Sequence, residues 1–146
     1  KGFTAQDFAK YHPGGALGKR MYLKVSDIYP QHDFPVIPPD ASIQEAIHEI
    51  SSKRLGATAV VNAENQLIGI ITDGDVRRML EKKSNWSEIQ LEDMMNRTPK
   101  TIEADSFATE ALAIMQSLNI TQLVVMENKK AVGFVHLHDL LKEGIV

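Results

Sequence analysis

The sequence predicts an α+β protein made of two copies of one β-α-β-β-α unit, packed together as a pseudo-two-fold pair. Three observations lead to this fold class. The chain can be written twice from Val25 onward, with a period of about 65 residues. Each copy alternates extended apolar segments with apolar residues at helical spacing. One copy alone is too short to bury a stable core, so we expect the two copies to pack against each other.

The repeat consists of matching residues that recur in the same order. A period of this length, seen twice, indicates a duplicated small domain rather than a solenoid. The matched pairs are residues 25–28 with 91–94, residues 59–61 with 124–126, Gly69 with Gly133, and Asp75 with Asp139.

The first copy begins with a short extended segment over residues 35–37, which Pro38 and Pro39 end. Residues 40–42 offer N-cap side chains for a helix, and Leu55-Gly56 ends that helix. Its apolar residues recur at helical spacing, and they are Ile43, Ala46, Ile47 and Ile50.

Two strands and a second helix complete the first copy. Residues 57–61 and 67–71 are continuously apolar, which predicts strands buried on both faces, and residues 62–66 form the turn between them. Residues 73–82 carry the pattern of a helix. In the second copy the corresponding elements are expected over residues 100–102, 107–118, 122–126, 131–136 and 138–143.

Residues 1–24 differ from the rest of the chain. A short amphipathic helix pattern over residues 3–11 is broken by a Pro-Gly-Gly segment, and neither has a counterpart later. We therefore divide the chain into residues 1–24, a first unit over residues 25–84 and a second unit over residues 85–146. The chain starts at Lys1 in what looks like the middle of an element, so we expect it to be a fragment of a longer polypeptide.

Composition excludes several classes of function. The formal charge of -3 gives no basic field for nucleic acid, so no nucleic-acid partner is expected. The absence of cysteine excludes disulfides, thiolate metal sites and a cysteine nucleophile, and favours a reducing compartment. No apolar run approaches the roughly 20 residues of a membrane-spanning helix, so we expect no membrane partner and a cytoplasmic location.

Thr72 and Asp75 stand where the last strand of the first copy meets its last helix. Their spacing predicts a capping box, in which each side chain bonds the backbone of the other residue. It also suits a ligand, because Asp75 can accept hydrogen bonds from two ribose hydroxyls while Thr72 and the helix start approach a phosphate. The two roles are compatible. Arg77 and Arg78 oppose the helix dipole, so each is either a contact for a ligand anion or a solvated surface charge.

The second copy has His136 in the place of Thr72, which leaves Asp139 without a hydroxyl partner. A metal site built from His136, His138 and Asp139 can be imagined. No third histidine lies nearby in sequence, and histidines in a cleft are more commonly packed or hydrogen-bonded. We therefore expect no metal.

The duplicated unit, with Gly-x-x-Thr-x-x-Asp at the end of its last strand, resembles the CBS domain family over residues 25–146. The resemblance implies a disc-like pair whose cleft binds adenine or other nucleotides as regulatory ligands, with no required cofactor. It also implies contacts to the ligand at the start of each unit and at the strand after its first helix. By position these residues are Ile37, Ala57, Thr58, Thr101, Thr121 and Gln122. The altered junction of the second copy adds His136, His138 and Asp139 as candidate ligand contacts.

Residues 8–20, 69–78 and 136–141 resemble the C-terminal part of the D-arabinose-5-phosphate isomerases, which join a sugar isomerase (SIS) domain to a CBS pair in the pathway to Kdo of lipopolysaccharide or capsule. The resemblance makes residues 1–24 the tail of a SIS domain with its linker, and places His12 in the isomerase site. Without the rest of that domain, no catalysis is expected from this chain.

The same resemblance implies CMP-Kdo or an adenine nucleotide as the regulatory ligand. The implied partners are the chain's own SIS domain and a second copy, in a homodimer through the CBS pairs that becomes a tetramer in the parent enzyme. The alternative is a structural module that only assembles oligomers and has no physiological ligand.

Overall fold

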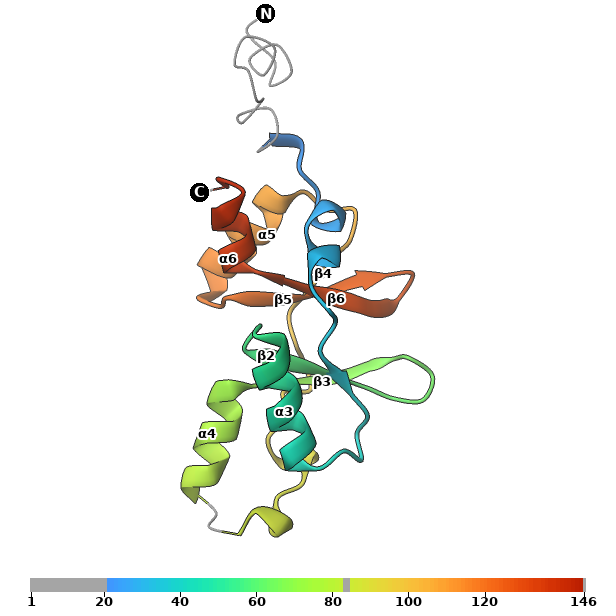
Figure 1. The fold of residues 1–146 in the computed structure, drawn as a ribbon. Coiled ribbons are helices and arrows are strands. Elements are labelled where there is room, and N and C mark those ends of the chain that lie inside the picture. The colour runs from blue at the N-terminus through green and yellow to red at the C-terminus, as the bar shows by residue number, and fades with distance from the viewer. Residues whose placement is uncertain (1–20, 83–84, 146) are drawn as a thin grey trace, which may run out of the picture.

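A computed structural model of the chain describes residues 21–82 and 85–145, which form two units stacked one on the other (Figure 1). The predicted α+β class and the β-α-β-β-α order of each unit are confirmed. The helical pattern over residues 3–11 and His12 lie outside the described residues. No helix in the described part of the chain is long and apolar enough to cross a membrane.

The first unit contains β1 (Val36–Ile37), α3 (Ile43–Lys53), β2 (Ala57–Val61), β3 (Leu67–Thr72) and α4 (Asp73–Lys82). The second contains β4 (Thr101–Glu103), α5 (Ala108–Leu118), β5 (Gln122–Glu127), β6 (Lys130–His136) and α6 (Leu137–Lys142).

Each unit holds one three-stranded sheet, and the two sheets have the same topology. In the order β1-β2-β3, the central strand β2 is parallel to β1 and antiparallel to β3. The order β4-β5-β6 repeats this arrangement around β5. A parallel pair needs a crossover, and α3 and α5 supply it because each lies between the two parallel strands in sequence.

The two sheets face each other, and helices cover their outer faces (Figure 1). Successive side chains of β2 point to opposite faces, so Ala57, Ala59 and Val61 pack between the sheets while Val60 packs under the helices. From the other unit, Val124 and Phe134 fill the same inter-sheet layer. Burial on both faces explains why these strands are continuously apolar in the sequence.

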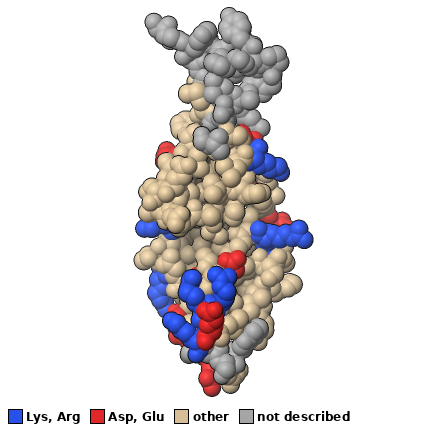
Figure 2. Space-filling model, turned by 90° about the vertical axis from the view of Figure 1, so that its left-hand side faces the viewer, with Lys and Arg blue, Asp and Glu red and all other residues tan. Residues whose placement is uncertain are grey.

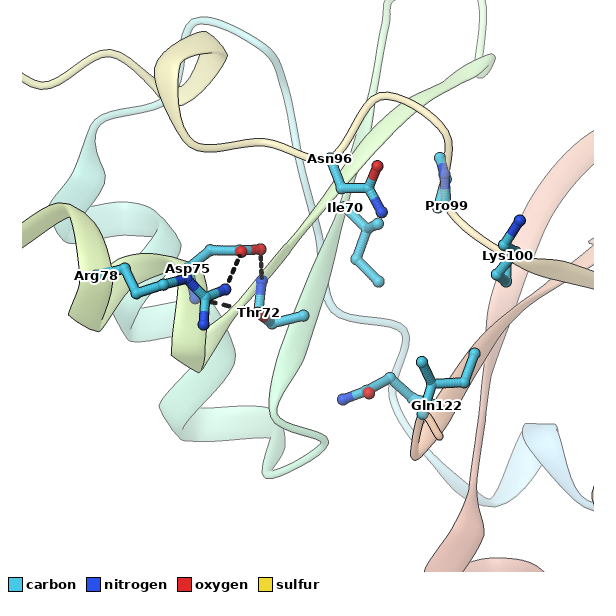
Figure 3. A pocket seen from close by; sticks show the side chains of 9 residues that line it. Ile70, Thr72, Asp75, Arg78, Asn96, Pro99, Lys100 and Gln122 are labelled. Atoms are coloured by element: carbon cyan, nitrogen blue, oxygen red, sulfur yellow. Dashed lines mark hydrogen bonds and ion pairs between the residues drawn. The ribbon is translucent and has the colours of Figure 1, made fainter. Parts of the chain in front are cut away.

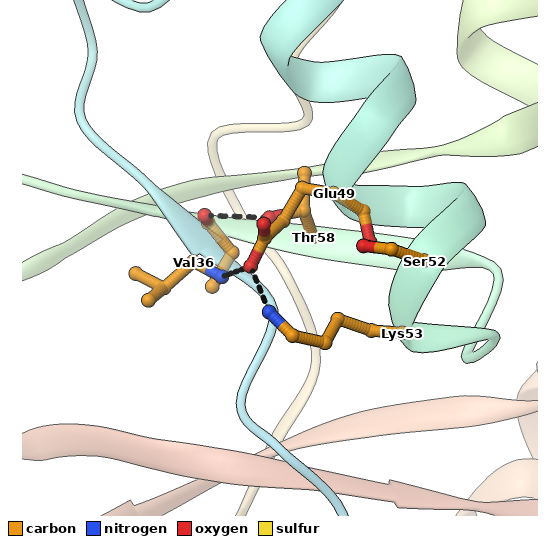
Figure 4. Close-up of polar contacts among 6 residues, drawn as sticks. Val36, Glu49, Ser52, Lys53 and Thr58 are labelled. Atoms are coloured by element: carbon orange, nitrogen blue, oxygen red, sulfur yellow. Dashed lines mark hydrogen bonds and ion pairs between the residues drawn. The ribbon is translucent and has the colours of Figure 1, made fainter.

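Helix α3 begins at a capping box formed by Ser42 and Glu45, where the Glu45 N–H donates to Ser42 Oγ at 3.1 Å. One turn from its end, Glu49 connects the helix to the edge strand. Its Oε2 accepts from the Val36 N–H at 3.1 Å and from Lys53 Nζ at 2.8 Å (Figure 4). The carboxylate therefore occupies a backbone donor on the outer edge of β1.

Short 3-10 turns begin each repeat. They are η1 (Val25–Asp27) with η2 (Tyr29–Gln31) at the start of the first unit, and η3 (Trp86–Glu88) with η4 (Leu91–Asp93) at the start of the second. Val25 and Ile28 belong to the core of the second unit, whereas Leu91 and Met94 belong to that of the first. The sequence repeat does not predict this exchange.

Close backbone approach accompanies the exchange in both units. A Cβ on Gly133 would lie 2.5 Å from the ring of Tyr29, and a Cβ on Gly69 would collide with the side chain of Met95. The glycine pair that marked the repeat therefore makes room for the segment that enters from the other repeat.

Candidate functional site

The junction of β3 and α4 forms the capping box that the sequence predicts. Thr72 Oγ1 accepts from the Asp75 N–H at 3.1 Å, and Asp75 Oδ2 accepts from the Thr72 N–H at 2.9 Å. The second oxygen, Asp75 Oδ1, accepts from Arg78 Nη2 at 2.7 Å. Backbone and cap thus fix the carboxylate, whose side chain is 19% exposed, while the side chain of Arg78 is 61% exposed.

This carboxylate faces a cavity of about 250 Å³ between the two units (Figure 3). Thr72, Asp75 and Arg78 lie on one side of it at the start of α4, and Lys100 and Gln122 lie on the other side. The cavity is therefore assembled from both repeats. Its remaining lining residues are Ile70, Asn96, Pro99 and Ile120.

The lining has distinct chemical regions. Ile70, Pro99 and Ile120 offer apolar surface for a flat group such as a base. Asp75 offers fixed acceptor oxygens, and the side chains of Arg78 and Lys100 offer positive charge. Such a set suits a ligand with an apolar ring, vicinal hydroxyls and an anionic group.

Asn96 presents a donor to the cavity in a fixed orientation. Its backbone forms two hydrogen bonds with Ile70, at 2.9 and 3.0 Å. Its side-chain oxygen accepts from the Thr98 N–H at 3.0 Å and from Thr98 Oγ1 at 3.3 Å. Because the oxygen is held by these donors, the amide nitrogen points toward the cavity (Figure 3).

Gln122 lines the cavity and also connects the two units. Its Nε2 donates to the Leu55 carbonyl of the first unit at 3.0 Å, and its Oε1 accepts from Thr121 Oγ1 at 3.0 Å. Thr121 thus orients Gln122 rather than lining the cavity itself.

The equivalent junction of β6 and α6 is built differently. His136 replaces the hydroxyl, since its Nδ1 accepts from the His138 N–H at 3.0 Å, and Asp139 Oδ2 accepts from the His136 N–H at 3.0 Å. Asp139 Oδ1 pairs with His32 Nε2 at 2.7 Å. Burial lowers the pKa of His136; Asp139 opposes this shift, and His138 and His32 reinforce it.

Of the residues predicted to contact a ligand, the structure brings Thr72, Asp75, Arg78 and Gln122 together in one cavity. The others lie elsewhere. Ile37 is in the core under α3, Ala57 is buried between the sheets, and Thr58 faces α3. Four more of the predicted ligand contacts are exposed and lie outside the cavity, and they are Arg77, Thr101, Thr121 and His138. His136 and Asp139 form the second junction.

The sequence prediction missed five lining residues, and for two of them it was one position away. Lys100 and Ile120 directly precede Thr101 and Thr121, and successive side chains of an extended segment point in opposite directions. Asn96 and Pro99 follow η4, which reaches the first unit only through the segment exchange. Ile70 could have been found, because it lies two residues before Thr72 on the same strand.

Charges of both signs are interspersed on the face that carries α4 (Figure 2). They gather over the first unit and form no single-sign stripe there. Within residues 21–82 and 85–145, no group of three or more His, Cys, Asp or Glu side chains could hold a metal ion.

Comparison with known proteins agrees with this architecture. A sequence model of the CBS domain matches residues 25–82 and 91–145. Arabinose 5-phosphate isomerase KdsD from Yersinia pestis is 39% identical over 147 aligned positions, and that from Escherichia coli is 38% identical. These alignments cover 100% of this chain and 45% of each relative, so the chain spans about half the length of the curated relatives it matches.

Solved structures share the fold at lower identity. The CBS domain protein NE2398 has a TM-score of 0.75 at 22% identity, over 84% of this chain and 98% of that one. The CBS domain pair of MJ0100, in complex with 5-methylthioadenosine and S-adenosyl-L-methionine, has a TM-score of 0.73 at 23% identity, over 83% and 94%. CBSX2 in complex with AMP has a TM-score of 0.69 at 18% identity, over 84% and 96%.

Proposed function

The chain belongs to the CBS domain family, and we propose that it is a regulatory module whose cavity at Asp75 binds a nucleotide. The observation that carries the proposal is the fixed carboxylate of Asp75 at the wall of a cavity that both repeats line. A ligand held there touches both units, so it stabilises the packing of the two units that accommodates it best.

In the proposed complex the ribose lies on Asp75, where two vicinal hydroxyls can donate to the carboxylate. The base lies on the apolar surface of Ile70, Pro99 and Ile120. Arg78, whose side chain is mostly exposed, turns from Asp75 toward a phosphate, and the start of α4 adds its dipole.

Two groups of ligands are proposed. Adenine nucleotides such as AMP or ATP are supported by the adenosine ligands in the complexes of MJ0100 and CBSX2, which share the fold. CMP-Kdo is supported by the similarity to arabinose 5-phosphate isomerases, as the end product expected to regulate such an enzyme. In either case the signal is passed to an attached isomerase domain, where His12 takes part in the reaction.

A ligand panel tests the proposal. The melting temperature and the binding heat of the chain are measured with AMP, ATP, CMP and CMP-Kdo at millimolar concentration, and at least one should raise Tm. If none does, the proposal is wrong.

Asp75→Asn is the informative variant, because its side-chain oxygen can still accept from the Thr72 N–H while the ribose loses a charged acceptor. We expect at least a tenfold loss of affinity, since a hydrogen bond to a charged group contributes about 1.5–3 kcal/mol. Asp73→Asn is the matched control. It removes the same charge from the same helix turn, outside the cavity, and should leave the affinity within twofold.

A structural module remains the second candidate, and two observations favour it. Both oxygens of Asp75 have partners without any ligand. The outer helices also expose apolar side chains, with Leu118 of α5 43% exposed and Leu141 of α6 46% exposed. This candidate predicts a homodimer that Leu118→Asp with Leu141→Asp dissociates in sedimentation experiments, and no Tm shift with any nucleotide of the panel.

A further inference from the structure

The repeat places a second carboxylate, Asp139, where Asp75 stands in the first unit. In both carboxylates Oδ2 accepts from a backbone N–H of the junction, that of Thr72 for Asp75 and that of His136 for Asp139. The two sites differ at Oδ1. A ribose hydroxyl would have to donate to Oδ1. The residue that already contacts Oδ1 therefore decides whether a ribose can bind at each site.

At Asp75 the partner of Oδ1 is Arg78, a mostly exposed side chain on the same helix that can move without disturbing the fold. At Asp139 the partner of Oδ1 is His32, which lies 107 residues earlier in the chain. The side chain of Asp139 is only 9% exposed and that of His32 is 28% exposed.

Packing holds His32 in place. We call residues 25–32 the lead segment. Its Val25 and Ile28 are fully buried in the core of the second unit, and its Tyr29 lies against Gly133 on β6. The His32 N–H donates to the Tyr29 carbonyl at 3.2 Å. The backbone that carries His32 is therefore held against the second unit, beside Asp139.

The segment that begins the second repeat has a different residue at the position of His32. Met95 lies against Gly69 as Tyr29 lies against Gly133, and three residues further on stand Thr98 and His32 respectively. The Thr98 hydroxyl bonds the side chain of Asn96 instead of a carboxylate. The copies thus differ at this position: His32 pairs with Asp139, whereas Thr98 bonds Asn96 and Asp75 pairs with Arg78 of its own helix.

We propose that His32 takes the place of a ribose on Asp139, so that the chain binds a single nucleotide, at Asp75, and Asp139 instead anchors the lead segment to the second unit. For its ligand this inference rests on the proposed function. The contact between His32 and Asp139 is tested separately, without a ligand.

Titration calorimetry with AMP and with CMP tests the stoichiometry. The unaltered chain should bind one equivalent, Asp75→Asn should weaken binding at least tenfold, and Asp139→Asn should change Kd by less than twofold. Two equivalents bound to the unaltered chain would overturn the inference. An equal loss of nucleotide affinity in Asp139→Asn and Asp75→Asn would also overturn it. Either result would still agree with the proposed function, because the chain would still bind a nucleotide.

A double-mutant cycle tests the anchor, and it decides the matter if no nucleotide binds. His32→Ala and Asp139→Ala should each lower Tm by about 5 °C, and the double variant should fall well short of the sum of the two shifts, because each change removes the same contact. Additive shifts would overturn the inference. If Asp139→Ala does not fold, Asp139→Asn takes its place in the cycle, since it keeps an oxygen for the His136 N–H.

Discussion

At the scale of the residue, Asp75 and Asp139 show how one carboxylate can serve two purposes. Each closes a capping box with one oxygen, which the physics of a helix start explains without any ligand. The other oxygen contacts an exposed arginine in one copy and a histidine of the lead segment in the other. The side chain that faces the second oxygen therefore distinguishes the two junctions.

His136 makes the stability of the chain depend on pH. Burial lowers the pKa of His136 in the folded state. Below about pH 6.5 the unfolded state therefore binds more protons than the folded state, and the chain becomes less stable as the pH is lowered. An imidazolium also cannot accept from the His138 N–H. Between about pH 7.5 and about pH 5.5, Tm should fall more for the unaltered chain than for His136→Asn, which caps without titrating. Parallel melting curves in the two proteins would contradict this role.

Asn96 is expected to read the base through its cavity-facing amide nitrogen. Asn96→Asp keeps an acceptor for Thr98 but replaces the donor with a charged oxygen. Nucleotide affinity should therefore drop at least tenfold in calorimetry, or about 1.4 kcal/mol, while Tm without ligand stays nearly the same. An unchanged Kd would show that the base does not contact this residue.

At the scale of the element, the first strand of each unit lies at the edge of its sheet and is very short, and β1 has only two residues. Such a strand depends on its neighbours for stability. Strand pairing with β2 holds one side of β1, and Glu49 of α3 accepts from the Val36 N–H on the other. One carboxylate thus connects α3 to Val36 of the strand that precedes this helix in the sequence.

Glu49→Ala should destabilise the chain by about 1 kcal/mol, because the Val36 N–H and Lys53 both lose a partner. Glu49→Gln is the control, since its amide oxygen can still accept from the Val36 N–H. Urea unfolding should place its midpoint between those of the unaltered chain and the alanine variant. If both variants unfold together with the unaltered chain, Glu49 does not support β1.

At the scale of the molecule, the two units are joined by exchange as well as by contact of their sheets. The sheets pack through small and apolar side chains, and apolar residues from the start of each repeat, such as Ile28 and Leu91, complete the core of the other. We expect the pair to unfold in one cooperative step, because neither core is complete without a segment that precedes the other unit.

Gly133→Ala tests the exchange. Its Cβ would lie 2.5 Å from the rigid ring of Tyr29, so the lead segment must shift, at a cost of about 2 kcal/mol. Gly74→Ala is the contrasting change, because there the Cβ meets only the flexible ends of Arg78, at 3.2 Å, and Arg77, at 3.7 Å, inside a helix that favours alanine. Thermal unfolding should show a lower Tm for the first variant and an equal or higher Tm for the second. Equal Tm values in the two variants would argue against close packing of Tyr29.

The sequence by itself determined the repeat, the order of the strands and helices, and the capping box of Thr72 with Asp75. These features are local, since they depend on apolar spacing, turn residues and side chains three positions apart. Only the tertiary structure decided the segment exchange, the placement of Asn96 and Lys100 opposite Asp75, and the contact of His32 with Asp139. Each of these depends on which surfaces of two similar units meet, and residues 107 positions apart carry no periodic signal of their contact.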